Sequence, residues 1–271
     1  MKYPYGKNVF LTGGSSGIGL AASELLAASG YIVFAASRNP PEDIRRFPGG
    51  GEIRPITLDV RDPQSTESAA ASVKSDIGII IHCAGIGIAC PGEDYPSDAV
   101  MGLMETNWGG VLRVNSRFLP RLRERGCGLC VIVGSVAGVF PIPFQSHYSA
   151  SKAALDSYAA ALRMELRSYG VRICLVMPGD TNTGFTAQRK YEIDGASPYY
   201  SACIRAAAKM EKDELGGRPP VSAAKVILKL CGRKNPPARM TVGFDYKLMV
   251  FLKRLLPYRT VEFILRAMYI K

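Results

Sequence analysis

The chain has 271 residues, of which 47% are hydrophobic, so it can bury a sizeable core and is too apolar for a disordered chain. Its net charge of +11 leaves three kinds of partner open: nucleic acid, an anionic membrane surface or an anionic small molecule. We expect no nucleic acid, because no zinc-ligand spacing, RNA-binding signature or long basic run is present.

Strand-like and helix-like segments alternate along the chain. The predicted strands are Asn8–Thr12, residues 31–37, 53–58, 77–83 and 129–135, Val171–Met177 and residues 240–242. The predicted helices are residues 18–28, one that starts at Asp62-Pro63, residues 97–125 and 148–169, and Val221–Cys231. This alternation predicts an α/β fold with a single Rossmann-type doubly wound parallel sheet and helices on both faces.

The regular pattern ends after Pro178. Between about residues 180 and 218 we expect a substrate loop with short helices. No internal repeat or linker is present, so residues 1–243 are predicted to form one domain that includes this loop. Residues 244–271 are predicted to form an amphipathic, helical C-terminal extension.

Cysteine usage favours a reducing compartment. The chain has seven cysteines, an odd number, and residues 1–8 lead into the first strand without a signal peptide, so a cytoplasmic location is expected. Cys127 and Cys130 form a lone CxxC pair, which we interpret as buried thiols, and no metal site is predicted. Two uncharged runs, residues 77–92 and 126–151, are interrupted by Gly, Pro and Ser and predict buried strands rather than membrane spans.

A glycine-rich turn, Thr-Gly-Gly-Ser-Ser-Gly-Ile-Gly, occupies residues 12–19 between the first predicted strand and its helix. Its glycines lack the Cβ atoms that would block an approaching phosphate, and its backbone N–H groups precede a helix N-terminus. The spacing GxxxGxG directly after a first strand therefore predicts a dinucleotide pyrophosphate site. The predicted contacts are Gly13, Ser15, Ser16, Gly17, Ile18 and Gly19.

The second predicted strand ends in Ala-Ala-Ser-Arg at residues 35–38. NAD-binding folds often place an acidic residue at this point to hold the ribose 2′-hydroxyl. Ser37 and Arg38 instead offer a hydroxyl and a guanidinium, which suit a 2′-phosphate through charge-assisted hydrogen bonds. These two residues predict NADP(H) as the cofactor; the alternative is that Arg38 is a solvated surface arginine.

A tyrosine and a lysine stand four residues apart in Tyr148-Ser-Ala-Ser-Lys152, on one face of a predicted helix. A free tyrosine titrates near pH 10, which is too high for efficient acid–base chemistry at neutral pH. A nearby cation favours the phenolate, so we expect Lys152 to lower the pKa of Tyr148. Ser135, at a predicted strand end, could polarise a substrate oxygen, and Asn107 could hold a proton-relay water through its amide.

These motifs together resemble the short-chain dehydrogenase/reductase family over roughly residues 5–200. The resemblance implies that Tyr148 donates a proton, that Lys152 tunes its pKa and binds the ribose, and that Ser135 orients the carbonyl. It implies that Asn107 takes part in the proton relay. It also implies that Asp59 lies near the adenine and Thr183 on the nicotinamide carboxamide. The further cofactor contacts are Val60, Ala84, Gly85, Pro178, Gly179 and Thr181.

One motif departs from the family pattern. The family usually has Asn-Asn-Ala-Gly after the fourth strand, whereas this chain has His82-Cys83-Ala84-Gly85. We expect this difference to affect the packing of the cofactor wall and not the chemistry. His82 and His147 are the two histidines, and both are interpreted as structural.

Residues 134–144, which lead into the Tyr148 motif, resemble the hydroxysteroid and retinol dehydrogenase branch of the family. A lipophilic small molecule, first a hydroxysteroid or bile acid, is therefore the expected substrate. A different lipid carbonyl, acyl-dihydroxyacetone phosphate or retinal, is the alternative. Substrate contacts are expected from Ser135, Tyr148 and Phe185. The loop that carries Phe185 is interpreted as a lid, and its alternative is a surface crossover.

The extension at residues 244–271 carries six Lys and Arg against Asp245 and Glu262, and Pro257 divides it into two helical pieces. It could pack over the substrate pocket or on a neighbouring subunit, or dock peripherally on a membrane surface. Family resemblance implies a homodimer or homotetramer. A non-catalytic NADP(H)-binding sensor is the alternative to an enzyme, and the presence of both Tyr148 and Lys152 argues against it.

Overall fold

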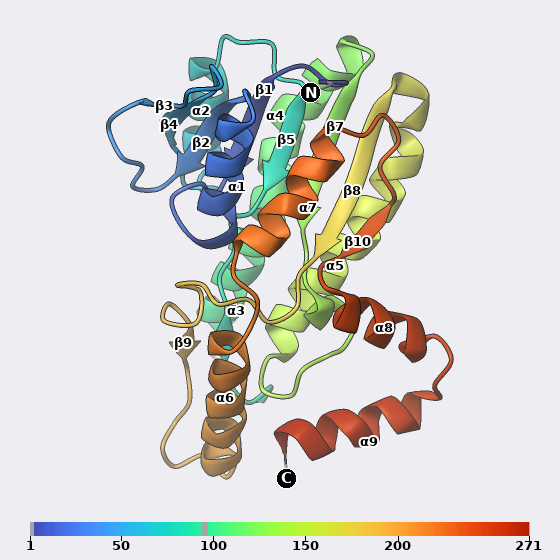
Figure 1. The fold of residues 1–271 in the computed structure, drawn as a ribbon. Coiled ribbons are helices and arrows are strands. Elements are labelled where there is room, and N and C mark those ends of the chain that lie inside the picture. The colour runs from blue at the N-terminus through green and yellow to red at the C-terminus, as the bar shows by residue number, and fades with distance from the viewer. Residues whose placement is uncertain (1–2, 94–96, 271) are drawn as a thin grey trace.

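The computed structural model describes residues 3–93 and 97–270. Within these ranges, eight strands form one sheet in the order β10-β8-β7-β5-β1-β2-β4-β3 (Figure 1). Neighbouring strands are parallel except for β3 and β4. The predicted α/β fold is confirmed. The strands are β1 (Asn8–Thr12), β2 (Ile32–Ser37), β3 (Arg45–Arg46), β4 (Glu52–Thr57), β5 (Ile79–His82), β7 (Gly128–Val133), β8 (Val171–Met177) and β10 (Arg239–Thr241).

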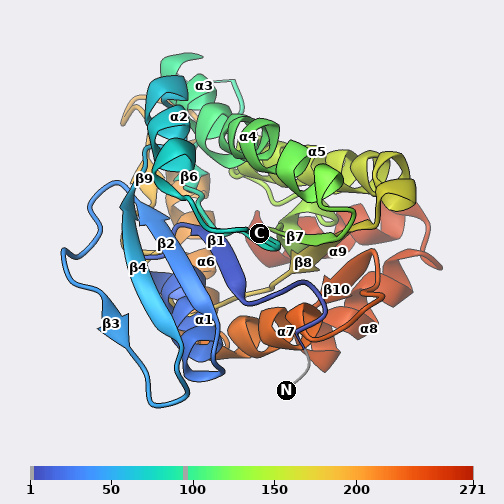
Figure 2. The same cartoon turned by 90° about the horizontal axis from the view of Figure 1, so that it is seen from above.

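Helices cover both faces of this sheet (Figure 2). Alternation along β1 explains the two layers, because Phe10 enters one hydrophobic core while Val9 and Leu11 enter the other. Helices α2, α4 and α5 pack on the Phe10 side, and α1 and α7 pack on the opposite side. Their bounds are α1 (Gly17–Ala28), α2 (Pro63–Ser72), α4 (Gly110–Glu124), α5 (Ser146–Glu165) and α7 (Val221–Cys231).

Helix ends follow local chemistry. Asp62 caps α2, since its carboxylate accepts a hydrogen bond from Gln64 N at 2.8 Å, and Pro63 is the first helical residue, as predicted. The predicted helix at residues 97–125 is instead three segments: α3 (Ser97–Met104), the π-helical turn η1 (Glu105–Gly109) and α4. A π-helical turn inside an α-helix frequently marks a functional site.

The region after β8 contains more helix than the sequence analysis predicts. Helix α6 (Tyr200–Leu215) replaces the expected loop with short helices, because four apolar side chains at helical spacing are buried along it: Cys203, Ala206, Ala207 and Met210. Two helices follow on either side of Pro257, as predicted, α8 (Phe244–Lys253) and α9 (Tyr258–Tyr269). Figure 1 shows α6, α8 and α9 together beyond one end of the sheet. In the part of the chain that the structure describes, no helix is long and apolar enough to span a membrane.

Candidate active site

The predicted site residues gather at the carboxyl edge of the sheet. They lie directly after β1, β2, β4, β5, β7 and β8, where the loops leave parallel strands side by side. The strand order changes direction between β1 and β5, so their exit loops diverge there and form the position where open α/β sheets bind ligands. The helices α6, α8 and α9 lie beyond the same edge (Figure 1).

Close backbone packing shapes the glycine turn. Gly13 has a φ of +73°, and its N–H donates to Ala36 O at 2.8 Å, which draws the turn against β2. A Cβ on Gly13 would be 2.7 Å from Ala84 N, and one on Gly19 would be 2.0 Å from Gly13 O. Any other residue at either position would therefore displace backbone atoms. The turn ends at α1, whose first turn carries no acidic residue that would repel a phosphate.

The polar side chains at the end of β2 fit a nucleotide. The Ser37 hydroxyl is buried, and it has no hydrogen-bond partner among the residues that the structure describes. Arg38 is exposed beside it. Arg38 is also close enough to Asp59 that its charge helps to lower the pKa of that carboxyl, after the dominant hydrogen bond from Arg61. An acceptor bound here would satisfy Ser37 and meet the Arg38 guanidinium, so the residues present fit a dinucleotide with a 2′-phosphate.

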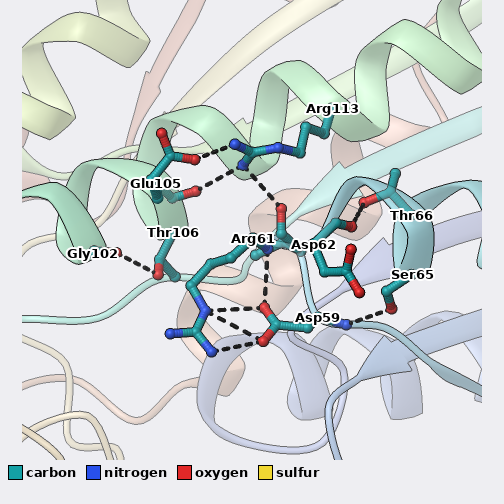
Figure 3. A network of polar contacts seen from close by, with 10 residues as sticks. Asp59, Arg61, Asp62, Ser65, Thr66, Gly102, Glu105, Thr106 and Arg113 are labelled. Atoms are coloured by element: carbon teal, nitrogen blue, oxygen red, sulfur yellow. Dashed lines mark hydrogen bonds and ion pairs between the residues drawn. The ribbon is translucent and has the colours of Figure 1, made fainter.

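A polar network holds the Asp59-Val60 segment (Figure 3). Arg61 donates to the Asp59 carboxylate through its backbone and its guanidinium, at 2.9 Å from its own N and 2.7 Å from Nη2. Arg113 donates from Nη1 to Val60 O at 3.3 Å and forms an ion pair with Glu105 at the start of η1. Arg113 thereby links the segment after β4, where the adenine is expected, to the π-helical turn that carries Asn107.

Asn107 is fully buried and holds three elements together. Its Oδ1 accepts from Ile86 N at 2.8 Å, and its Nδ2 donates to Ile86 O and to Ser151 Oγ, each at 3.0 Å. Both amide hydrogens are thus engaged, so the side chain joins the loop after β5 to α5. The amide therefore positions these elements, and its expected part in a proton relay stays a prediction.

Tyr148, Lys152 and Ser135 meet beside that amide. The Lys152 Nζ is buried, donates to Val133 O at 3.1 Å and lies 5.6 Å from the centroid of the Tyr148 ring. The Ser135 hydroxyl accepts from Ala137 N at 3.0 Å and also hydrogen-bonds with the Tyr148 phenol. A Cβ on Gly85 would lie 3.6 Å from Lys152 Nζ, so the predicted cofactor wall reaches the same point.

Burial shifts the pKa values of Tyr148 and Lys152, and the shift of Tyr148 differs from the expectation. Burial raises the pKa of Tyr148 to about 12, while hydrogen bonding from Ser135 lowers it in part. Burial likewise lowers the pKa of Lys152 to about 8. The predicted lowering of the Tyr148 pKa by Lys152 is wrong for this arrangement, because the ammonium donates to the Val133 carbonyl and loss of hydration dominates both groups.

The exit of β8 is fixed by residues of the C-terminal extension. Pro178 O accepts from Val136 N at 2.9 Å, which joins the exits of β7 and β8. The Tyr246 ring of α8 lies on Gly179, where a Cβ would be 2.2 Å from the ring, and its hydroxyl donates to Asp180 Oδ2 at 2.5 Å. The extension therefore packs at the edge of the site, one of the positions that the sequence left open. Lys253 of α8 adds a hydrogen bond to the Val139 carbonyl.

Two threonines follow at the exit of β8. Thr181 Oγ1 donates to Gly179 O at 2.9 Å. Thr183 Oγ1 accepts from Phe185 N at 3.2 Å, and a Cβ on Gly17 would be 3.4 Å from Thr183 Cβ. Thr183 thus packs directly against the glycine turn.

Phe185 borders the reacting group from the lid. Its ring centroid lies 5.7 Å from that of Tyr148, and a Cβ on Gly87 would be 2.6 Å from its Cζ. Two short parallel strands, β6 (Ile88–Ala89) and β9 (Lys190–Tyr191), tie the lid to the loop after β5. The segment therefore covers Tyr148, which agrees with the lid interpretation.

The histidines and the CxxC pair lie in packed regions. His82 is buried and hydrogen-bonds to Asn115 Oδ1 at 2.9 Å, and burial lowers its pKa to about 4. Burial also lowers the pKa of His147. Cys130 donates to Asn115 Oδ1, Cys127 donates to Pro4 O, and both cysteines are free thiols. Across residues 3–93 and 97–270, no cluster of three or more His, Cys, Asp or Glu could hold a metal ion.

Sequence reasoning missed two contributions to the site. Ser151 lies inside the Tyr148 motif yet serves Asn107, and its position one residue before Lys152 gives no sign of that. Arg189 is buried in the lid with Glu214 of α6 as its partner, although the two are 25 residues apart. An arginine beside aromatic residues was the only available signal, and surface arginines look the same in sequence.

Comparison with known proteins supports the family expected from the motifs. The family profile described as short chain dehydrogenase matches residues 7–194. The 3-ketodihydrosphingosine reductase of Bacteroides thetaiotaomicron is 35% identical over 267 residues, which cover 96% of this chain and 97% of that protein. Retinol dehydrogenase 8 of Bos taurus is 30% identical over 268 residues, which cover 93% and 86% of the two chains.

A solved structure gives the same result. The short-chain dehydrogenase from Streptomyces avermitilis aligns with a TM-score of 0.78 and 25% identity, over 92% of each chain. The predicted family is confirmed, whereas the hydroxysteroid and retinol branch stays a prediction because the relatives act on different lipids by name. The chain thus belongs to the short-chain dehydrogenase family, as an oxidoreductase that acts on CH–OH groups with a nicotinamide dinucleotide.

Proposed function

We propose that this protein is an NADPH-dependent reductase that converts a ketone on a lipophilic molecule to a secondary alcohol. The observation that carries the proposal is the meeting of Tyr148, Ser135 and Lys152 under the Phe185 ring, at the carboxyl edge of the sheet. An apolar ring over a partly buried proton donor suits an apolar substrate and helps to exclude water from the reacting carbonyl.

Tyr148 supplies the proton in this proposal. With its pKa raised to about 12, the phenol is protonated at neutral pH and can donate to the oxygen of a ketone as that oxygen gains negative charge. The Ser135 hydroxyl, which already hydrogen-bonds with Tyr148, holds the same oxygen in place. A bound nicotinamide supplies the hydride.

The glycine turn, Ser37, Arg38 and the exit of β8 would hold the dinucleotide. We propose a preference for NADPH, because Arg38 and the orphaned Ser37 hydroxyl stand where NAD-specific folds place a carboxylate.

The Arg38→Ala variant is expected to lower the NADPH-to-NADH ratio of kcat/KM about 10- to 100-fold, since a hydrogen bond to a charged group is lost. Steady-state kinetics with both cofactors measures this ratio. Arg45→Ala, which removes another exposed arginine on β3, should leave the ratio unchanged. Equal use of both cofactors by the unmutated protein would show that the preference is absent.

The substrate is proposed to be a long-chain lipid ketone. The Bacteroides thetaiotaomicron relative, whose name specifies a keto-lipid, matches over nearly the whole chain. The test compares this lipid ketone with other carbonyl compounds. These are ketones of hydroxysteroids and bile acids, which were the first expectation from the sequence, and also retinal and acyl-dihydroxyacetone phosphate. NADPH oxidation by the purified protein is followed with each carbonyl, and turnover of any of them rejects the alternative of a non-catalytic sensor. Turnover confined to a steroid would overturn the lipid-ketone proposal while leaving the reductase intact.

We also propose that α8 and α9 dock on an anionic membrane surface. Large apolar side chains on these helices and in the turn between them are exposed next to basic ones, with Phe251 at 56%, Leu255 at 67% and Phe263 at 65% exposure. Among the described residues of α9, only Val261 is buried. Lys247, Arg254, Arg259 and Arg266 supply the positive charge, and Lys271 lies outside the described residues.

The paired substitution Phe251→Glu/Leu255→Glu is expected to lower binding to vesicles that contain phosphatidylserine by about tenfold or more, because two apolar side chains lose their burial in lipid. Co-sedimentation of the full-length protein measures this, with Met164→Glu on α5 as the control, since Met164 is 74% exposed. No binding by the unmutated protein would remove the proposal. Light scattering without vesicles tests the proposed homodimer or homotetramer.

A further inference from the structure

A buried arginine lies in the lid. Arg189 follows Phe185 by four residues, and its side chain is 0% exposed. One of its amino groups, Nη2, forms an ion pair with Glu214 near the end of α6. The same carboxylate accepts from Thr186 Oγ1 at 2.5 Å. The lid turn and α6 are therefore joined through one partly buried carboxylate.

Two donors of this arginine are unused. Nε and Nη1 of Arg189 are buried, and neither has a hydrogen-bond partner among the residues that the structure describes. A guanidinium carries five N–H donors and is always charged in proteins. Buried donors of this kind are normally satisfied, so each one without a partner calls for an acceptor that the chain itself does not provide.

Arg189 lies in the lid turn that borders Tyr148. Phe185, in the same turn, contacts the Tyr148 ring, and Arg189 N donates to Thr186 O at 3.2 Å. The next residue, Lys190, donates to Gly87 O at 3.3 Å, which anchors the turn to the loop after β5. Arg189 and Glu214 both act electrostatically on the Tyr148 phenol. The guanidinium thus belongs to the surroundings of the substrate carbonyl.

We propose that Arg189, held by Glu214, binds a neutral oxygen of the substrate, such as a hydroxyl or an ester or amide carbonyl, that lies a few bonds from the ketone. This inference rests on the proposed function and specifies its substrate class. It selects lipid ketones with a polar head over ketones whose surroundings are purely hydrocarbon.

The charges of Arg189 and Glu214 favour a neutral oxygen as the ligand over a carboxylate or a phosphate. The Glu214 carboxylate already balances the Arg189 guanidinium, so an added anion would leave the buried group with a net negative charge. A neutral oxygen accepts a hydrogen bond from Nε or Nη1 and adds no charge. The Arg189–Glu214 pair can therefore donate hydrogen bonds to a substrate oxygen while the pair remains electrically neutral.

The test compares two long-chain ketones that differ in one group. One carries a hydroxyl two carbons from the carbonyl, and the other is the same ketone without it. The unmutated protein should reduce the hydroxylated ketone with a kcat/KM about 10- to 100-fold higher, because one charge-assisted hydrogen bond is gained. In Arg189→Gln this preference should fall to within about twofold, with the loss mainly in KM.

Further variants separate recognition from folding. Arg189→Gln/Glu214→Gln removes both charges together, so no buried charge is left unpaired, and it should lose the preference equally. Arg205→Gln, which changes an exposed arginine of α6, should keep it. NADPH binding and thermal unfolding confirm that each variant is folded.

The outcomes separate the two proposals. Equal reduction of both ketones by the unmutated protein, or a loss in Arg189→Gln that is the same for both, would show that Arg189 only latches the lid. Tight NADPH binding without oxidation by any ketone in the panel would instead overturn the proposed reductase itself.

Discussion

Tyr148→Phe is expected to lower kcat/KM for ketone reduction by about 10²- to 10⁴-fold, the range that a positioned proton donor contributes. Phenylalanine keeps the ring that packs 5.7 Å from Phe185 and removes only the hydroxyl bonded to Ser135. Without that hydroxyl, the oxygen of the ketone gains negative charge with no group beside it that can transfer a proton, although the Ser135 hydroxyl can still hydrogen-bond to it. NADPH oxidation by the purified variant measures the loss, and fluorescence titration checks that NADPH still binds.

The same helix provides a control for this substitution. Tyr158 lies nearly three turns further along α5, where its hydroxyl accepts from Asn115 Nδ2 at 3.2 Å. Tyr158→Phe also deletes one partly buried phenol, but at a distance from the lid and the glycine turn, so its kcat/KM should stay within about twofold. Comparable losses in the two variants would assign the effect to the packing of α5 and remove Tyr148 as proton donor.

Lys152→Met is expected to abolish most activity and yet to raise the free energy of unfolding at neutral pH. Burial lowers the pKa of Lys152 from its ordinary 10.5 to about 8, so the folded state holds its charge unfavourably. One pKa unit is worth about 1.4 kcal/mol, and the burial cost is therefore about 3 kcal/mol near pH 7. Loss of the hydrogen bond to Val133 O offsets about 1 kcal/mol, leaving a gain of about 2 kcal/mol.

The stability difference depends on pH in a defined direction. Because the pKa of Lys152 is lower in the folded than in the unfolded state, the unfolded chain binds more protons between about pH 8 and 10.5. The unmutated protein therefore gains stability from this group as pH rises through that window, and the advantage of Lys152→Met shrinks. Urea denaturation at several pH values measures both curves. Lys225→Met, an exposed lysine of α7, should show no such trend.

A less stable Lys152→Met variant at pH 7 would contradict the argument from burial. Activity gives an independent check, because reduction should fall as pH rises through about 8, where the ammonium of Lys152 is lost. The phenol, with its pKa raised to about 12, keeps its proton over the same range. A falling limb above pH 8 thus reports Lys152 and not Tyr148.

Local patterns in the sequence were sufficient to predict the fold class and to propose most residues of the candidate site. Side chains that alternate along β1 require a sheet covered on both faces, and Asp62-Pro63 combines a favoured N-cap residue with a favoured first helical residue. The GxxxGxG turn fits directly after β1 because its first glycine, Gly13, contacts Ala84 so closely that a larger residue would clash. Tyr148 and Lys152 are four residues apart in α5, and this spacing places them on one face of the helix.

Other features depend on which segments fold against one another. Tyr246 reaches Asp180 across 66 residues, and Asn107 meets Ser151 across 44, and neither contact leaves a local signal. The helix α6 was missed because its apolar spacing has meaning only once a surface exists to bury it. Long-range pairing is decided by the complementarity of whole surfaces, which short-range patterns do not contain.

By itself, the sequence determined the family and the alternation of strands and helices, since these follow from motifs and from the spacing of neighbouring residues. It also predicted Tyr148 and Lys152 as the reacting groups. Only the tertiary structure decided how those groups ionise. Tyr148 and Lys152 lose hydration from elements distant in the chain, and that loss moves their pKa values more than their proximity to each other does. The lid's Arg189 acquired its partner Glu214 in the same way, because burial is a property of the folded chain and not of any single segment.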